Sequence, residues 1–174
     1  MLKGFLLGLF AAIVVAACGG YALLASGAIP ANADAPPNPV EKWAAQKSLQ
    51  ATIRRDAPKG PPPIAATPEN LAAGLKLYAI HCAVCHGAAD GKASAIARGL
   101  YQRAPQLGRH GVEDDPEGET YWIIHHGVRM TGMPSFAASL SQDQIWQLTL
   151  FLKHMDDLPP AVASAWKNLP SQAH

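Results

Sequence analysis

The chain has 174 residues and a net charge of +1, and only 16% of its residues are charged. This length suits one domain with extensions, and the charge balance argues against a nucleic-acid-binding protein. There are three cysteines, of which two lie three residues apart, so a disulfide framework is excluded.

The N-terminal segment is apolar and carries no charge from residue 4 to residue 33. A helix of about 20 apolar residues spans a bilayer, and Lys3 favours a cytoplasmic N-terminus. We therefore expect residues 1–33 to be an uncleaved membrane anchor. Two alternatives stay open: lipid attachment at Cys18, within the lipoprotein-like sequence Val15-Ala16-Ala17-Cys18-Gly19, and cleavage at the A-x-A-like sequence Ala31-Asn32-Ala33.

Residues 34–67 have the proline-rich composition of a linker. Asn38 followed by Pro39 is a typical helix start and predicts a helix from Pro39 to about Asp56. Its apolar face is thin and consists of Val40, Trp43, Leu49 and Ile53. The segment is either a tether or a helix that packs on the following domain or on the membrane, with Trp43 as the expected contact. Residues 58–63 contain four prolines and predict a stiff, extended spacer.

The motif that organises the chain is Cys82-Ala83-Val84-Cys85-His86, which has the spacing C-x-x-C-H. Two cysteines at this spacing lie on one face of a helical turn, where each can form a thioether with one vinyl group of a haem. The histidine that follows is then placed as an axial ligand of the iron. A zinc site would need a second ligand pair, and a thioredoxin-like site would need a βαβ context. We therefore predict one haem c, attached through Cys82 and Cys85, with His86 as a metal ligand.

Helices are predicted on both sides of this motif. Thr67 and Pro68 begin a helix to about Cys82, and the capping box at Ser141 begins another to about Met155. Residues 159–174 begin with two prolines and predict a C-terminal tail, in which Trp166 is the residue suited to dock. Tyr121 and Trp122 belong to a helix that ends at Gly127, where His125 and His126 would be favoured in the protonated state.

Residues 127–134 form a loop punctuated by glycine and proline, and it contains Met130 and Met133. A thioether opposite a histidine completes the coordination of a haem iron and raises its reduction potential. We favour Met133 as the second metal ligand, because the preceding Gly132 and the following Pro134 favour an exposed loop conformation there. The alternatives for the second ligand are Met130, a histidine or an open coordination position on the iron.

Together these residues resemble a class I mono-haem c-type cytochrome, of the bacterial membrane-anchored kind. The resemblance covers about residues 67–158 and rests on the C-x-x-C-H motif, Pro105-x-Leu107, Thr131-Gly132-Met133-Pro134 and a last helix ending Phe151-Leu152-Lys153. It implies an all-α class I cytochrome c fold for residues 68–158.

The resemblance also implies particular contacts within this fold. The first and last helices would cross at a glycine–aromatic contact, with Gly74 and Tyr78 against Leu148 and Phe151. The carbonyl of Pro105 would accept a hydrogen bond from the imidazole of His86. The residues expected near the haem propionates are Tyr121, Trp122 and Arg129.

The function that the resemblance implies is single-electron transfer between respiratory-type redox proteins, rather than catalysis. Haem is attached to cysteine outside the cytoplasm, so we expect the haem domain on the periplasmic side of the bacterial inner membrane. The alternative is a haem subunit of a larger dehydrogenase or oxidase. A di-haem peroxidase would need a second C-x-x-C-H, and a sensor would need a displaceable Met133.

Residues 69–157 contain seven Lys or Arg and ten Asp or Glu, a balance of −3. We therefore expect redox partners with basic docking faces and rates that fall as salt rises.

Overall fold

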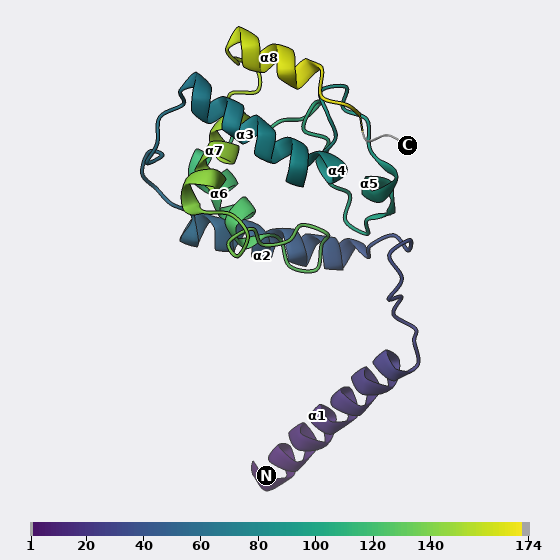
Figure 1. Cartoon of the computed structure of the whole chain (residues 1–174). Coiled ribbons are helices and arrows are strands. Elements are labelled where there is room, and N and C mark those ends of the chain that lie inside the picture. Colours follow the sequence, from purple (N-terminus) through teal and green to yellow (C-terminus); the bar gives the residue numbers. More distant parts are fainter. Residues whose placement is uncertain (1, 172–174) are drawn as a thin grey trace. The chain divides into compact units, whose positions relative to one another are not determined.

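The computed structural model describes residues 2–171, and within them it is all-helical, with no strand (Figure 1). The chain divides into two units, residues 1–35 and residues 36–174. The all-α fold class predicted from the sequence is confirmed.

The first unit is helix α1, Leu2–Ala25, followed by a short irregular segment. None of its residues is buried. By length and composition α1 is apolar enough to cross a membrane, and an N-terminal signal sequence would meet the same criterion. The predicted helix is therefore confirmed, and its role as an anchor stays a prediction.

The core of the second unit is the crossing of α3, Pro68–His81, with α7, Gln142–Lys153. A Cβ atom on Gly74 would collide with the carbonyl of Gln147 and lie 2.7 Å from Cβ of Phe151, so glycine is what lets the two helices approach this closely. Tyr78, Leu148 and Phe151 are fully buried beside this contact. The expected glycine–aromatic crossing is confirmed.

Three shorter helices complete the region between α3 and α7. They are α4, Ala83–His86, α5, Ala95–Gly99, and α6, Glu117–His126. The single turn of α4 holds most of the C-x-x-C-H motif directly after α3, while α6 packs against α7. The motif is therefore held between the helix crossing and the loops that follow it.

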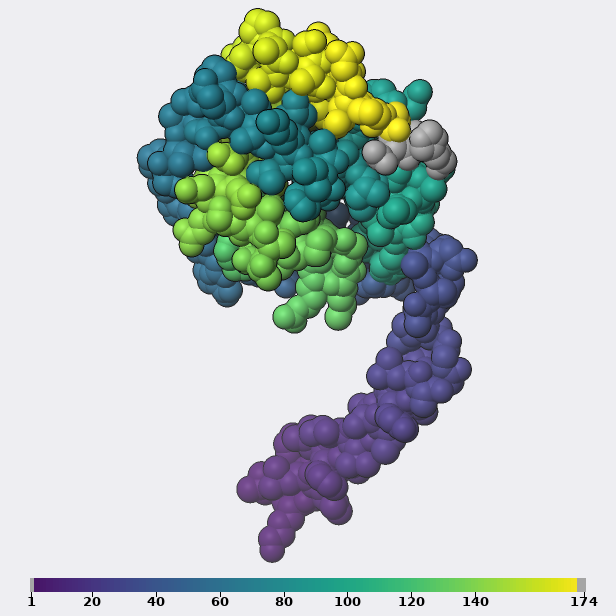
Figure 2. All heavy atoms as spheres, in the orientation of Figure 1, coloured from purple at the N-terminus to yellow at the C-terminus, as the bar shows by residue number. Residues whose placement is uncertain are grey.

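The segment expected to be a C-terminal tail contains a further helix, α8, Pro160–Lys167. Trp166 is buried there, with its ring 5.3 Å from that of Tyr78 and 5.7 Å from that of Phe151, both at steep angles. In the space-filling view the yellow atoms of α8 lie across the blue atoms of α3 (Figure 2). The compact unit thus continues beyond residue 158, because Val162 and Trp166, four residues apart, share one apolar face.

Helix α2 spans Pro39–Asp56, as predicted, and Asn38 caps it by accepting a hydrogen bond of 2.9 Å from the amide of Val40. It packs against α6 within the second unit. The buried residue of α2 is Ile53, which is 6% exposed, whereas Trp43, the expected contact, is 62% exposed. Of the alternatives that the sequence left open, packing on the following domain is the one observed.

Candidate functional site

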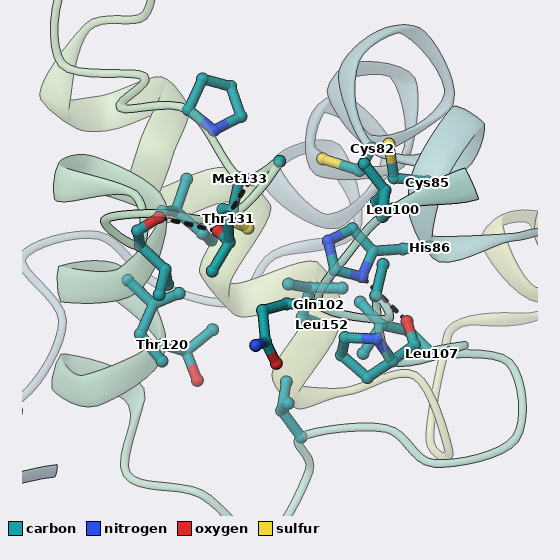
Figure 3. Close-up of a pocket in the computed structure, with 18 of the residues that line it drawn as sticks. Cys82, Cys85, His86, Leu100, Gln102, Leu107, Thr120, Thr131, Met133 and Leu152 are labelled. Atoms are coloured by element: carbon teal, nitrogen blue, oxygen red, sulfur yellow. Dashed lines mark hydrogen bonds between the residues drawn. The ribbon is translucent and has the colours of Figure 1, made fainter. Parts of the chain in front are cut away.

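A cavity of about 480 Å³ lies inside the second unit and is lined mainly by apolar side chains (Figure 3). Its size falls within the range of small-molecule and cofactor sites, about 300–1,000 Å³. All five residues that the sequence singled out line it together: Cys82, Cys85, His86, Pro105 and Met133. They come from α4 and the residue that precedes it, from the loop after α5 and from the loop after α6.

The C-x-x-C-H turn is held in place by hydrogen bonds to its backbone. The hydroxyl of Tyr78 donates to the carbonyl of Gly87 at 2.8 Å. The amide of Leu107 donates to the carbonyl of His86 at 3.0 Å, and the side chain of Gln106 donates to that of Cys85, also at 3.0 Å. The buried carbonyls of the turn are thus satisfied from α3 and from residues 106–107.

The imidazole of His86 is oriented by Pro105. Nδ1 of His86 lies 2.9 Å from the carbonyl oxygen of Pro105. A carbonyl only accepts, so Nδ1 carries the proton and Nε2 keeps its lone pair free for a metal. Burial also lowers the pKa of His86, which favours the neutral, ligating form. The hydrogen bond expected from the resemblance is therefore present.

The loop after α6 turns Met133 toward the cavity. The hydroxyl of Thr131 donates to the carbonyl of Val128 at 2.7 Å and accepts from the amide of Met133 at 3.1 Å. Gly127, at φ +67°, lies against Pro134 where a side chain would collide. Met133 and His86 project into the cavity from opposite sides (Figure 3). Met130, in contrast, is 89% exposed and is not among the lining residues.

The two cysteines lie at one end of the cavity, with both sulfur atoms on the same side (Figure 3). Burial, together with the neighbouring Cys85, raises the pKa of Cys82 to about 12, so its thiol is neutral in the folded chain. A covalently attached haem needs two thiols to bond its vinyl groups, and an imidazole and a thioether can ligate its iron. All four groups surround this apolar cavity. The residues present therefore fit this cofactor.

Several lining residues were missed by sequence reasoning. Gln46 and Leu49 of α2 contribute, as do Gln102 and Arg103 from the loop before Pro105. Gln102 and Arg103 could have been expected in the lining, because they lie close to Pro105 in the sequence. For α2 the signal was its thin apolar face, which includes Leu49.

The residues expected near the haem propionates do not line the cavity. Tyr121, Trp122 and Arg129 are not among the lining residues. Tyr121 stacks on Trp146 at 4.2 Å instead. Arg103 is the one Lys, Arg, Asp or Glu side chain in the lining, considering the part of the chain that the structure describes.

His125 also differs from expectation. Its Nδ1 atom is buried without a hydrogen-bond partner among the described residues, and its ring stacks on Tyr121. Burial and the neighbouring His126 lower the pKa of His125, which opposes the protonation expected at a helix C-terminus. Loss of solvation therefore acts against the helix dipole at this position.

An all-helical domain built around a C-x-x-C-H turn, with an apolar cavity beside it, defines a c-type cytochrome domain. Residues 69–152, a little under half of the chain, match the family model described as cytochrome c oxidase, cbb3-type, subunit III. We therefore assign this part of the chain to the mono-haem c-type cytochromes, a family of electron-transfer domains that carry covalently bound haem.

One curated relative is 33% identical over 92 residues: the quinohemoprotein alcohol dehydrogenase ADH IIB of Pseudomonas putida. The match covers 53% of this chain and 12% of that protein. The chain thus spans about an eighth of the length of the relative, and the likeness concerns one domain of it.

Proposed function

We propose that this protein is a membrane-tethered carrier of single electrons, with one haem c attached through Cys82 and Cys85 and ligated by His86 and Met133. The observation that carries the proposal is that these four side chains line one apolar cavity, with His86 and Met133 on opposite sides. When bound, the haem iron supplies one-electron redox chemistry.

The residues of the chain define how such a group would be held. Pro105 keeps the proton of His86 on Nδ1, so Nε2 is the ligating atom. The thioether of Met133 would be the second protein ligand of the iron, and it would leave no open position for a substrate. The apolar walls exclude water, which favours electron transfer over chemistry at the metal.

We further propose that residues 1–33 anchor the chain in the bacterial inner membrane and place the haem domain on the periplasmic side. The length and apolar composition of α1 support an anchor, and haem attachment outside the cytoplasm supports the orientation. The haem domain begins at residue 68 in this scheme, after the linker 34–67. Its compact part includes α2 and α8 as well.

The partners are redox proteins with basic docking faces. Five of the seven residues 113–119 are acidic, and residues 69–157 carry a balance of −3. Association with a basic face would be accelerated by this charge and screened by salt. Electron-transfer rates with such partners should fall as ionic strength rises, and rates independent of salt would contradict this part of the proposal.

A second candidate function is a haem subunit of a larger oxidoreductase complex. It is favoured by the two matches, because one is described as a subunit of an oxidase and the other is a dehydrogenase. Gentle detergent extraction followed by gel filtration separates the two candidates. A carrier elutes alone, whereas a subunit elutes with a catalytic chain.

The ligation is tested on the full chain, matured with haem and solubilised in detergent. The ferric protein should show the weak far-red absorption band of sulfur bound to haem iron. Met133→Ala should abolish this band, and Met130→Ala should keep it because the Met130 side chain lies in solvent. Absence of the band from the parent protein would overturn His/Met ligation.

A further inference from the structure

Helix α2 lies outside the segment that matches the cytochrome family, yet it forms part of the cavity wall. The family match begins at residue 69, whereas α2 spans Pro39–Asp56. Gln46 and Leu49 line the same cavity as His86 and Met133. These two α2 residues are three apart, so they lie on one face of the helix.

The C-terminal end of α2 is fixed on the domain by buried contacts. Ile53 is 6% exposed, and Ala57, directly after the helix, is 4% exposed. A Cβ atom on Gly118 of α6 would collide with the carbonyl of Pro58. This end therefore packs closely against α6.

The other end of α2 is joined to the loop that carries Pro105. The hydroxyl of Tyr101 donates a hydrogen bond of 2.7 Å to the carboxylate of Glu41. The residues next to Tyr101, Leu100 and Gln102, line the cavity. Helix α2 thus runs along the cavity from α6 to this loop, and it lies beneath α6 in the view of Figure 1.

We propose that α2 is a strap that contacts the haem and shields its edge from water, with Leu49 against the cofactor and Gln46 at the rim. The proposal rests on the proposed function, because it needs haem in the cavity. It extends the haem site to residues outside the family domain. The half-buried Leu49 faces the cavity, whereas its neighbour Gln50 is exposed on another face.

The consequence of this placement is electrostatic. Oxidised haem carries one more positive charge than reduced haem, so a negative charge close to it stabilises the oxidised form and a positive charge the reduced form. The effect is strong where water is excluded and weak where a charge is solvated and screened. The reduction potential therefore reports which face of α2 touches the haem.

The test is a redox titration of the haem-loaded full chain in detergent at physiological salt. Leu49→Glu should lower the reduction potential and Leu49→Lys should raise it. The matched pair Gln50→Glu and Gln50→Lys should leave it close to the parent value. The far-red sulfur band should persist in all four variants. The proposal is overturned if both Leu49 variants shift the potential in one direction, or if they behave as the Gln50 pair does.

Hydrogen exchange provides a second measurement that does not depend on introduced charges. The amides of α2 should exchange more slowly in the haem-loaded chain than in a Cys82→Ala, Cys85→Ala chain without haem. The amides of α8, which lines no part of the cavity, should change less. Equal protection of α2 in both states would overturn the strap.

The two proposals fail in different ways. If the parent chain takes up no haem, both the carrier function and the strap are wrong. If the parent shows the sulfur band but α2 responds to neither measurement, the carrier function stands and only the strap is wrong.

Discussion

At the scale of single residues, Tyr78 connects the core to the C-x-x-C-H turn. Its ring packs between Phe151 and Trp166, while its hydroxyl reaches the carbonyl of Gly87 at 2.8 Å. Burial strongly raises the pKa of Tyr78, so the hydroxyl remains a donor at any physiological pH. The position of the turn therefore depends on a side chain in the helix before it.

Tyr78→Phe should remove the hydrogen bond without removing the packing. A buried carbonyl left without its donor costs about 1–3 kcal/mol, so unfolding by urea should move to a lower midpoint. Tyr101→Phe is the matched control, because its hydroxyl bonds to Glu41 at the exposed surface. A Tyr78→Phe variant as stable as that control would show that the bond contributes nothing.

His125 should make stability depend on pH. Its pKa is lower in the folded chain than the ordinary value of 6.5, so the unfolded chain takes up the proton first as pH falls. The contribution of His125 to stability is present above about pH 6.5. It is lost as pH falls through the lowered folded pKa. Unfolding midpoints measured from pH 8 to pH 5 should fall less steeply in His125→Gln, and parallel curves would refute this role.

At the scale of the elements, the contact between two helices reverses the effect on stability that helix propensity alone predicts for a glycine-to-alanine substitution. Alanine is favoured over glycine inside a helix by about 1 kcal/mol, so propensity predicts that Gly74→Ala stabilises α3. The crossing with α7 leaves no room for the added methyl group. The sign of the change is therefore set by the tertiary contact.

Gly74→Ala should destabilise the domain by about 1–3 kcal/mol or more, as overpacking does. Gly99→Ala is the control, because a Cβ atom there meets nothing within 4 Å. Thermal unfolding of the two variants beside the parent gives the comparison. A rise in melting temperature for Gly74→Ala would mean that the two helices can separate without cost.

Helix α8 should contribute to folding through Trp166. Replacing a buried tryptophan by alanine typically costs about 3–5 kcal/mol, and Trp166 is 7% exposed. Trp166→Ala should lower the unfolding midpoint strongly, whereas Lys167→Ala, on the exposed face of α8, should leave it unchanged. Equal midpoints for the two variants would show that α8 adds little to the core.

At the scale of the whole molecule, the two units have separate tasks in the proposed function. Residues 36–174 contain the cavity and its supporting helices. Residues 1–35 contain α1, which buries none of its residues. In the proposed function, the exposed apolar surface of α1 is the part that a membrane would cover.

The full chain should remain with the membrane fraction after an alkaline carbonate wash. A version in which residues 1–35 are replaced by a cleavable export signal should be soluble and keep its haem spectrum. Release of the full chain with a new N-terminus after Ala33 would show cleavage instead of anchoring. Loss of membrane attachment in Cys18→Ala would show lipidation.

The sequence by itself determined the local features of this protein. The C-x-x-C-H spacing, the cap at Asn38 and the capping box at Ser141 each involve residues within a few positions of one another. The same holds for the loop around Met133, where Gly132 permits turn conformations and Pro134 restricts the backbone. Such features follow from covalent spacing and hydrogen bonds within a turn, so they can be predicted without knowing how the helices pack.

Only the tertiary structure decided which distant residues share the cavity. Leu49 and Arg103 line it, whereas Tyr121 does not, and α8 docks where a tail was expected. These outcomes depend on how helices cross, and the crossing depends on close contacts such as that of Gly74 with α7. Small differences in side-chain volume choose among many compact arrangements of the same helices. The C-x-x-C-H motif can therefore be identified from the sequence alone, whereas the residues that line the cavity beside it are determined by how the helices pack.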